Sequence, residues 1–278
     1  MCGIAGIITP YNDKRDRTRL AEVLLHDIDI RGGDSCGVYV GGRIIKEPVR
    51  AYEFPLPTIR GSCIMHTRMA THGGVTRKNA HPFRRGRTVG VHNGICSNYH
   101  ELLPGAQVDS VAVIDAIDKY GVPIAYSRMR GTFATATVSH GVTTLARAGN
   151  PCYVYRAGDT HVFSSHPVGL WLHLISDEVE RVPLDDNHMI EFVNGRASMQ
   201  KPIKTLGYVS HWTGWNYKNG VTYVPAKKVQ KDCVVCDEPG AYDADLECHV
   251  CDSCYSGLKT AGSISVLSDD QPEYWECG

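Results

Sequence analysis

The chain has 278 residues, of which 42% are hydrophobic and 21% charged, so it can bury the core of one large domain or of a domain with a small appendage. Its 29 Lys and Arg against 30 Asp and Glu leave a formal net charge of -1, which excludes a globally basic nucleic-acid binder. No apolar run reaches the roughly 20 residues that a membrane helix needs. The opening MCGIAGIITP also lacks the basic region of a signal peptide.

Short strands dominate the expected secondary structure, in chain order. Residues 2–9 predict an apolar strand, and Asp16 is placed to cap a helix with apolar positions at helical spacing. A second helix should begin at Asp109 and end at Gly121–Pro123. Further strand candidates lie at 36–40, 62–70, 88–95, 132–139, 143–148, 152–157, 160–165 and 184–197. Those from 132 to 165 look like consecutive hairpins, and without regular strand–helix alternation the pattern favours an α+β fold.

The chain contains 11 cysteines. An odd and unevenly spread set does not resemble a secreted disulfide framework, so we expect a reducing, cytoplasmic location. Two Cys-x-x-Cys pairs in the C-terminal part could complete a tetrahedral site of four thiolates. The predicted ligands of a structural Zn²⁺ are Cys233, Cys236, Cys251 and Cys254. Cys248 could replace one of them, as could His249 less readily, and an iron–sulfur cluster or disulfides are the alternatives.

Cys2 directly follows the initiator methionine. Because cysteine is small, we expect Met1 to be removed, which would leave a free α-amine on the residue that carries the thiol. An α-amine titrates at about 7.7–8.0 and a free thiol at about 8.5. One residue could therefore supply both a nucleophile and the base that activates it.

Several motifs accompany this cysteine in a fixed order. They are MCGIAGI at the start, RGGDSCG at 31–37, HTRMATHG at 66–73, NAHPF at 79–83, VHNGICSN at 91–98, Asp109-Ser110, GTFA from 131, and LARAGNP at 145–151. In these motifs the chain resembles the class II glutamine amidotransferases, members of the N-terminal nucleophile hydrolase superfamily, over roughly residues 2 to 195. The resemblance implies a four-layer αββα sandwich with two antiparallel sheets, and hydrolysis of glutamine to glutamate and ammonia.

The resemblance also implies roles for residues that surround the nucleophile. The Asn93 side-chain amide and the Gly94 backbone N–H would form the oxyanion hole; a type I′ hairpin turn is the competing interpretation of Asn93-Gly94. Arg68 would bind the α-carboxylate of glutamine, unless it makes only a surface salt bridge. Asp109 would bind the α-ammonium, or act as a helix N-cap.

Two further residues, Thr71 and His72, belong to the same family loop as Arg68 and would line the substrate pocket. The sequence departs from many relatives at Met69, where they carry Trp. The run Phe83–Arg87 holds three arginines; a solvated loop is one interpretation, and a docking patch for an acidic partner, a nucleotide or nucleic acid is the other.

We therefore predict an amidotransferase domain at 2–205, a linker at 206–230, a zinc module at 231–256 and an acidic tail at 257–278. Too few residues follow the first domain for an acceptor domain, so ammonia is expected to pass to a separate synthetase or transferase. Direct binding of nucleic acid is not expected. The alternatives are a free-standing hydrolase of another amide and an inactive regulatory protein with the same fold.

Overall fold

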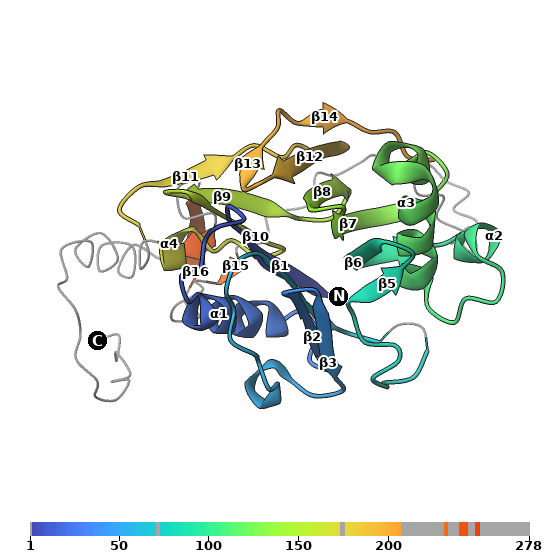
Figure 1. Cartoon of the computed structure of the whole chain (residues 1–278), viewed down its shortest axis with the longest axis horizontal. Helices are drawn as coiled ribbons and strands as arrows, with labels where there is room; N and C mark the ends of the chain where they lie inside the picture. The colour runs from blue at the N-terminus through green and yellow to red at the C-terminus, as the bar shows by residue number, and fades with distance from the viewer. Residues whose placement is uncertain are drawn as a thin grey trace. The chain divides into compact units, whose positions relative to one another are not determined.

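The computed structural model describes residues 2–70, 73–172, 176–206, 231–232, 239–243 and 248–250. The chain divides into two compact units, Met1–Trp212 and Thr213–Gly278. Within the described part of the chain, no helix has both the length and the hydropathy that crossing a bilayer requires. Two antiparallel sheets form the first unit (Figure 1).

The first sheet contains the strand that follows Cys2. Its strands pair antiparallel in the order β11-β9-β10-β1-β4-β2-β3. Their bounds are β1 (Gly3–Ile8), β2 (Ser35–Val40), β3 (Arg43–Glu47), β4 (Cys63–Arg68), β9 (Tyr153–Ala157), β10 (Thr160–Ser164) and β11 (Val179–Val182). Because β1 lies between β10 and β4, the start of β1 is fixed from both sides.

The second sheet has the strand order β13-β12-β8-β7-β6-β5, with β14 paired to β12. Its strands are β5 (Phe83–Arg85), β6 (Thr88–Cys96), β7 (Gly131–Ser139), β8 (Val142–Ala148), β12 (His188–Val193), β13 (Arg196–Ala197) and β14 (Lys201–Pro202). β7 and β8 form a hairpin here, and β9 and β10 form another in the first sheet. The expected consecutive hairpins are thus confirmed, but the chain changes sheets between them.

Helices cover the outer faces of the two sheets. Helix α1 (Thr18–Asp29) packs Leu24 and Ile28 against the first sheet, and α3 (Asp109–Tyr126) packs Val113 and Ile117 against the second. The shorter helices are η1 (Ala51–Glu53), α2 (Tyr99–Leu102) and α4 (Gly169–Leu172). The layers are therefore helix, sheet, sheet, helix, as the family resemblance implies (Figure 1).

Alternation along β1 explains how one strand serves two cores. Ala5 and Ile7 face the cluster that contains α1, whereas Ile4 and Ile8 face the core between the sheets. Fully buried Phe163 of β10 joins the core between the sheets. Side chains of successive strand residues point to opposite faces. Because both faces of β1 are buried, its sequence is the continuous apolar run GIAGII rather than an alternation of apolar and polar residues.

The ends of the two predicted helices can be compared with the sequence expectation. Arg17, rather than Asp16, is the N-cap of α1, and the Asp16 carboxylate accepts bonds from the Thr18 N–H and hydroxyl. Gly121, with φ of 73° and ψ of 161°, is not helical, so the first helical segment of α3 ends there, as predicted. A second helical segment follows through Tyr126 and buries further apolar side chains against the core of the second sheet.

In the second unit, the described residues form the antiparallel strands β15 (Lys231–Asp232), β16 (Pro239–Asp243) and β17 (Cys248–Val250). The four predicted zinc ligands, Cys233, Cys236, Cys251 and Cys254, lie outside the described residues. Among the residues that are described, no group of three or more His, Cys, Asp or Glu side chains could hold a metal ion.

Candidate functional site

Cys2 lies immediately before β1 and is a partly buried free thiol. Its Sγ donates to the Met69 carbonyl at 3.6 Å, and its own carbonyl accepts a bond from Arg31 Nε at 3.1 Å. Arg31 comes from the RGGDSCG motif and Met69 from HTRMATHG. Two of the motifs that carry the family resemblance thus contact the predicted nucleophile.

Opposing effects act on the pKa of the Cys2 thiol, which is raised overall. Burial is the largest and raises the pKa, whereas a hydrogen bond with the Met69 backbone and the positive charge of Arg68 lower it. The negative charge of Asp109 raises it. The charges of both predicted ligands of the amino-acid end thus reach the predicted nucleophile.

Asn93 lies in the interior of β6 and is 1% exposed. Its side-chain nitrogen Nδ2 is buried, and no acceptor among the described residues pairs with it. An unpaired buried donor lowers the free energy of unfolding, and this cost is removed when an acceptor binds the donor. The amide is therefore suited to bind an incoming oxyanion, the role that the resemblance implies.

Gly94 follows Asn93 within the same strand, so a type I′ hairpin turn at these two residues is wrong. Its φ of 149° lies in a region that favours glycine. A Cβ at this position would overlap the Thr132 carbonyl oxygen of β7 and crowd Asn150 Nδ2 and His92 Nε2. The strand can pass this close to its neighbours only because residue 94 has no side chain.

Asn150 is a bracing residue that the sequence analysis did not single out, although LARAGNP contains it. Its Nδ2 donates to the Asn93 carbonyl at 3.1 Å and to Thr132 Oγ1 at 3.2 Å. Asn150 is 8% exposed. It fixes the backbone of β6 at the residue whose side chain carries the unpaired donor.

Arg68 is the last residue of β4 and is 3% exposed, so a surface salt bridge is wrong for it. Its guanidinium donates to the Gly74 carbonyl at 3.2 Å and to the Gly73 carbonyl at 3.5 Å. Asn79 Nδ2 also donates to Gly74, at 3.1 Å. Arg68 thus anchors the loop that follows it. The predicted pocket residues of this loop, Thr71 and His72, lie outside the described residues.

Asp109 is the first residue of α3, and the N-cap is Val108. The side chain therefore does not cap the helix from the N-cap position. Its Oδ2 accepts from the Cys96 N–H at 3.0 Å, and its Oδ1 accepts from the Ser110 N–H at 2.8 Å and the Ser110 hydroxyl at 3.3 Å. These bonds tie the start of α3 to the end of β6.

Ser110 connects Asp109 to His92. His92 Nδ1 lies 2.9 Å from Ser110 Oγ. Because the single hydroxyl proton points to Asp109, His92 must be the donor, which places its ring proton on Nδ1 and leaves Nε2 as an acceptor. Nε2 is buried beside Gly94 with no partner among the described residues. A hydrogen-bonded network therefore runs from Asp109 through Ser110 to His92.

His66, His81 and His92 form a buried group between β4 and β6. The rings of His66 and His81 stack with centroids 3.7 Å apart, and His66 Nε2 bonds the His92 carbonyl at 3.1 Å. Burial lowers the pKa of His66 to about 3, and it lowers the pKa of His81 and of His92 as well. The three imidazoles are therefore neutral, and the His66–His92 bond joins the two sheets beside Asn93.

Lys46 of β3 holds the segment that contains His81. Its Nζ donates to the carbonyls of Ala80 at 2.7 Å, Pro82 at 3.3 Å and Lys78 at 3.4 Å. Burial, assisted by the charge of Arg77, lowers the pKa of Lys46 to about 8. Nothing in the sequence around Lys46 signals this role, since β3 itself was not among the expected strands.

Comparisons with known proteins agree with this geometry. No family model matches the chain. The glutamine–fructose-6-phosphate aminotransferase (isomerizing) of Gluconobacter oxydans is 27% identical over 269 residues, covering 83% of this chain and 43% of that protein. The enzyme of the same name from Caulobacter vibrioides is 31% identical over 242 residues, covering 74% of this chain and 39% of its own length. The chain thus spans about two fifths of these curated relatives.

Among solved structures, the glutamine phosphoribosylpyrophosphate amidotransferase of B. subtilis superposes with a TM-score of 0.58. It is 18% identical and covers 72% of this chain and 49% of its own, so this likeness concerns the fold. The fold and the cysteine at its first strand define an N-terminal nucleophile hydrolase. Within that class, the chain belongs to the class II glutamine amidotransferases.

The histidine group predicts how stability depends on pH. Below an ordinary pKa of about 6.5, unfolded histidines bind protons that the folded ones do not, so stability should fall as pH decreases from about 6.5 toward 3. Each such histidine contributes up to about 1.4 kcal/mol per pH unit. We expect His66→Gln to flatten the slope of the unfolding free energy between pH 6 and pH 5, measured by urea denaturation.

The matched control is His26→Gln, which removes an exposed histidine of α1. It should leave the slope as in the wild type. An equal slope in His66→Gln and the wild type would contradict a neutral buried His66.

Proposed function

We propose that this chain hydrolyses glutamine to glutamate and ammonia through a thioester on Cys2. The observation that carries the proposal is the buried, unpaired amide nitrogen of Asn93 in a site shared by Cys2, Arg68 and Asp109. A nucleophile, a donor aimed at a developing oxyanion and two opposite charges for an amino-acid end are what glutaminase chemistry requires.

In the proposed reaction, the Cys2 thiolate attacks the side-chain carbonyl carbon of glutamine. The carbonyl oxygen becomes an oxyanion, which accepts bonds from Asn93 Nδ2 and the Gly94 N–H. After removal of Met1, the α-amine of Cys2 takes the thiol proton and passes it to the departing nitrogen. The C–N bond breaks, ammonia leaves, and water then hydrolyses the thioester to glutamate and free Cys2.

Substrate selection would depend on the two charged residues. Arg68 would pair with the α-carboxylate and Asp109 with the α-ammonium, so that a free amino acid is preferred over a peptide side chain. Arg68 already bonds the carbonyls of Gly73 and Gly74. Binding of glutamine would therefore be coupled to the conformation of the loop that contains Thr71 and His72.

The curated relatives extend well beyond the region that they share with this chain. We propose that ammonia is delivered to an acceptor enzyme outside the matched region, supplied by a separate synthetase or transferase protein. A cytoplasmic location is also part of this proposal, because the odd and unevenly spread set of 11 cysteines does not resemble a secreted disulfide framework. The alternatives are hydrolysis of another amide and a purely regulatory role. The following experiments distinguish both of them from glutamine hydrolysis.

Labelling tests the nucleophile directly. A glutamine-analogue diazoketone should modify Cys2 of the mature chain, as mapped by peptide mass spectrometry, and Cys2→Ala should neither react nor release glutamate. Cys36→Ala is the control, because Cys36 is buried and its pKa is raised to about 12. Glutamate release by Cys2→Ala at the wild-type rate would refute the mechanism. Unlabelled Cys2 with turnover of another amide would favour the other hydrolase.

Removing the unpaired amide tests the oxyanion role. Asn93→Ala should lower kcat for glutamine roughly 10²- to 10³-fold, the usual cost of one oxyanion-hole donor. Asn98→Ala is the matched control: Asn98 is also buried but bonds the Arg130 N–H and the Arg128 carbonyl. It should lower stability in denaturation without a comparable loss of kcat. Equal effects of both variants on kcat would argue against the oxyanion role of Asn93.

For the C-terminal cysteines we propose, from the sequence alone, one structural Zn²⁺ bound by Cys233, Cys236, Cys251 and Cys254. Elemental analysis of the purified full chain should find one zinc per chain, and Cys236→Ser should lose it. Cys277→Ser is the control and should retain the metal. Iron in place of zinc would indicate a cluster, and the absence of any metal from the wild type would refute the proposal.

A further inference from the structure

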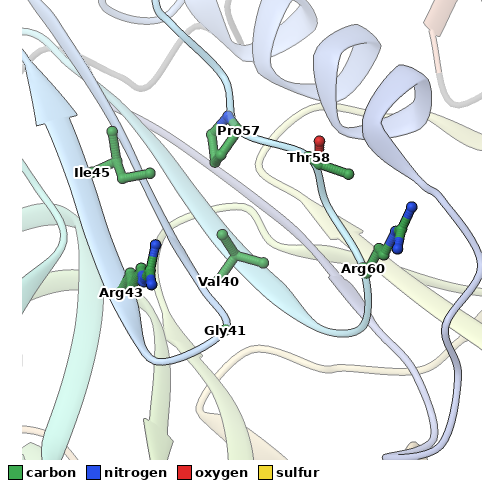
Figure 2. A pocket seen from close by; sticks show the side chains of 7 residues that line it. All are labelled: Val40, Gly41, Arg43, Ile45, Pro57, Thr58 and Arg60. Atoms are coloured by element: carbon green, nitrogen blue, oxygen red, sulfur yellow. The ribbon is translucent and has the colours of Figure 1, made fainter.

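A groove of about 600 Å³ opens at the turn between β2 and β3 (Figure 2). It is lined by Val40, Gly41, Arg43, Ile45, Pro57, Thr58 and Arg60. Figure 2 shows the Arg43 and Arg60 side chains on opposite sides of Val40, with Pro57 and Thr58 along the rim. Its floor is apolar and its flanks are cationic, a combination common in sites for small molecules that carry a charged group.

The two flanking arginines are exposed, and neither forms an ion pair with a carboxylate among the described residues. The backbone of Asp16 pairs with that of Arg60. The positive charge of Arg60 contributes to lowering the pKa of the Asp16 carboxyl. The Asp16 carboxylate is already bonded to Thr18. Arg43 and Arg60 thus both line the groove without a carboxylate ion pair, although the charge of Asp16 lies near Arg60.

The turn that carries Arg43 is held in place from the other sheet. Gly41 and Gly42 have φ of 55° and 80°, and a Cβ on either would meet nothing within 4 Å. Arg84, from the arginine-rich run, donates to the Gly42 carbonyl at 3.2 Å. Its neighbour Arg85 pairs with buried Asp115. The run is thus not a plain solvated loop, because Arg84 braces the turn before Arg43 and Arg85 pairs with Asp115. Its use as a docking patch stays a prediction.

A second hollow of about 220 Å³ shares Gly41 and Arg60 with the groove. Tyr11 and Tyr39 are among its lining residues. Aromatic rings next to guanidinium groups suit a ligand with an anionic end and a ring-shaped organic part. The Tyr11 hydroxyl is fixed by a bond to the Gly141 carbonyl at 2.9 Å.

We propose that this groove binds a small phosphate ester, with the phosphate between Arg43 and Arg60 and the organic part toward Tyr11 and Tyr39. A phosphate dianion matches two unpaired guanidinium groups better than a single carboxylate does. The groove adjoins the start of β4 and Arg68 is its last residue, so the six residues of the strand separate the two sites by roughly 17 Å. The ligand therefore does not compete with glutamine.

Calorimetric titration of the full chain tests this site with two matched pairs of probes. Glucose 6-phosphate is compared with glucose, and AMP with adenosine. At least one phosphorylated probe should bind. The Kd of the matching compound without phosphate should be roughly tenfold to hundredfold higher, which corresponds to the loss of one charge-assisted hydrogen bond. Arg43→Gln and Arg60→Gln should each weaken binding by a similar factor, and higher salt should weaken it in the wild type.

Arg19→Gln is the control, because Arg19 is an exposed arginine of α1 that pairs with Glu22. It should bind like the wild type. The proposal is overturned if no phosphorylated probe binds, if inorganic phosphate alone binds as tightly as both esters, or if Arg43→Gln and Arg60→Gln bind normally. Tight binding of polyglutamate with none of the phosphate esters would indicate an acidic protein partner and would also overturn it. The titration needs no glutaminase activity, so it stands or fails independently of the proposed reaction.

Discussion

The structure of the site depends on the pairing of β1 with β10 on one side and with β4 on the other. That pairing fixes the residue that precedes β1, and it brings Cys2 to the carbonyl of Met69 directly after β4. The bond from His66 to the His92 carbonyl then joins β4 to β6 across the interface of the two sheets. Cys2, Arg68 and Asn93, to which the family resemblance assigns roles, thus come from separate segments of the sandwich.

Much of the fold could be predicted from the sequence because its strands are short, apolar and separated by turns. The strands β1, β6, β7, β10 and β12 lie where alternation and apolar runs indicate them. The sheet to which each strand belongs could not be predicted, since the pattern within 143–157 does not show that the chain crosses from one sheet to the other after β8. The break of α3 at Gly121 was predicted, but the helical segment that continues to Tyr126 was missed, because its stabilisation by burial of Tyr126 is not visible in the sequence pattern.

At the site, the order of the motifs was enough to find the residues to which the family resemblance assigns roles. It did not reveal the residues that fix those side chains in place. Asn150 and Ser110 lie inside recognised motifs, yet their bonds to the Asn93 carbonyl and to Asp109 depend on strand register. Lys46 carries no sequence signal, because β3 is a short edge strand without clear alternation and its lysine resembles any solvated lysine. Supporting contacts of this kind arise from three-dimensional packing, which single-sequence patterns do not encode.

The hydrogen bonds from Asp109 through Ser110 to His92 restrict where the protons of these side chains can lie. A serine hydroxyl owns one proton, so it cannot donate to Asp109 and to His92 at once. If Asp109 turned away to bind a cation, the Ser110 hydroxyl would lose the acceptor of its proton, while His92 Nδ1 would still donate to the Ser110 oxygen. A cation at Asp109 would thereby release one hydroxyl donor beside His92 and leave the tautomer of the imidazole unchanged.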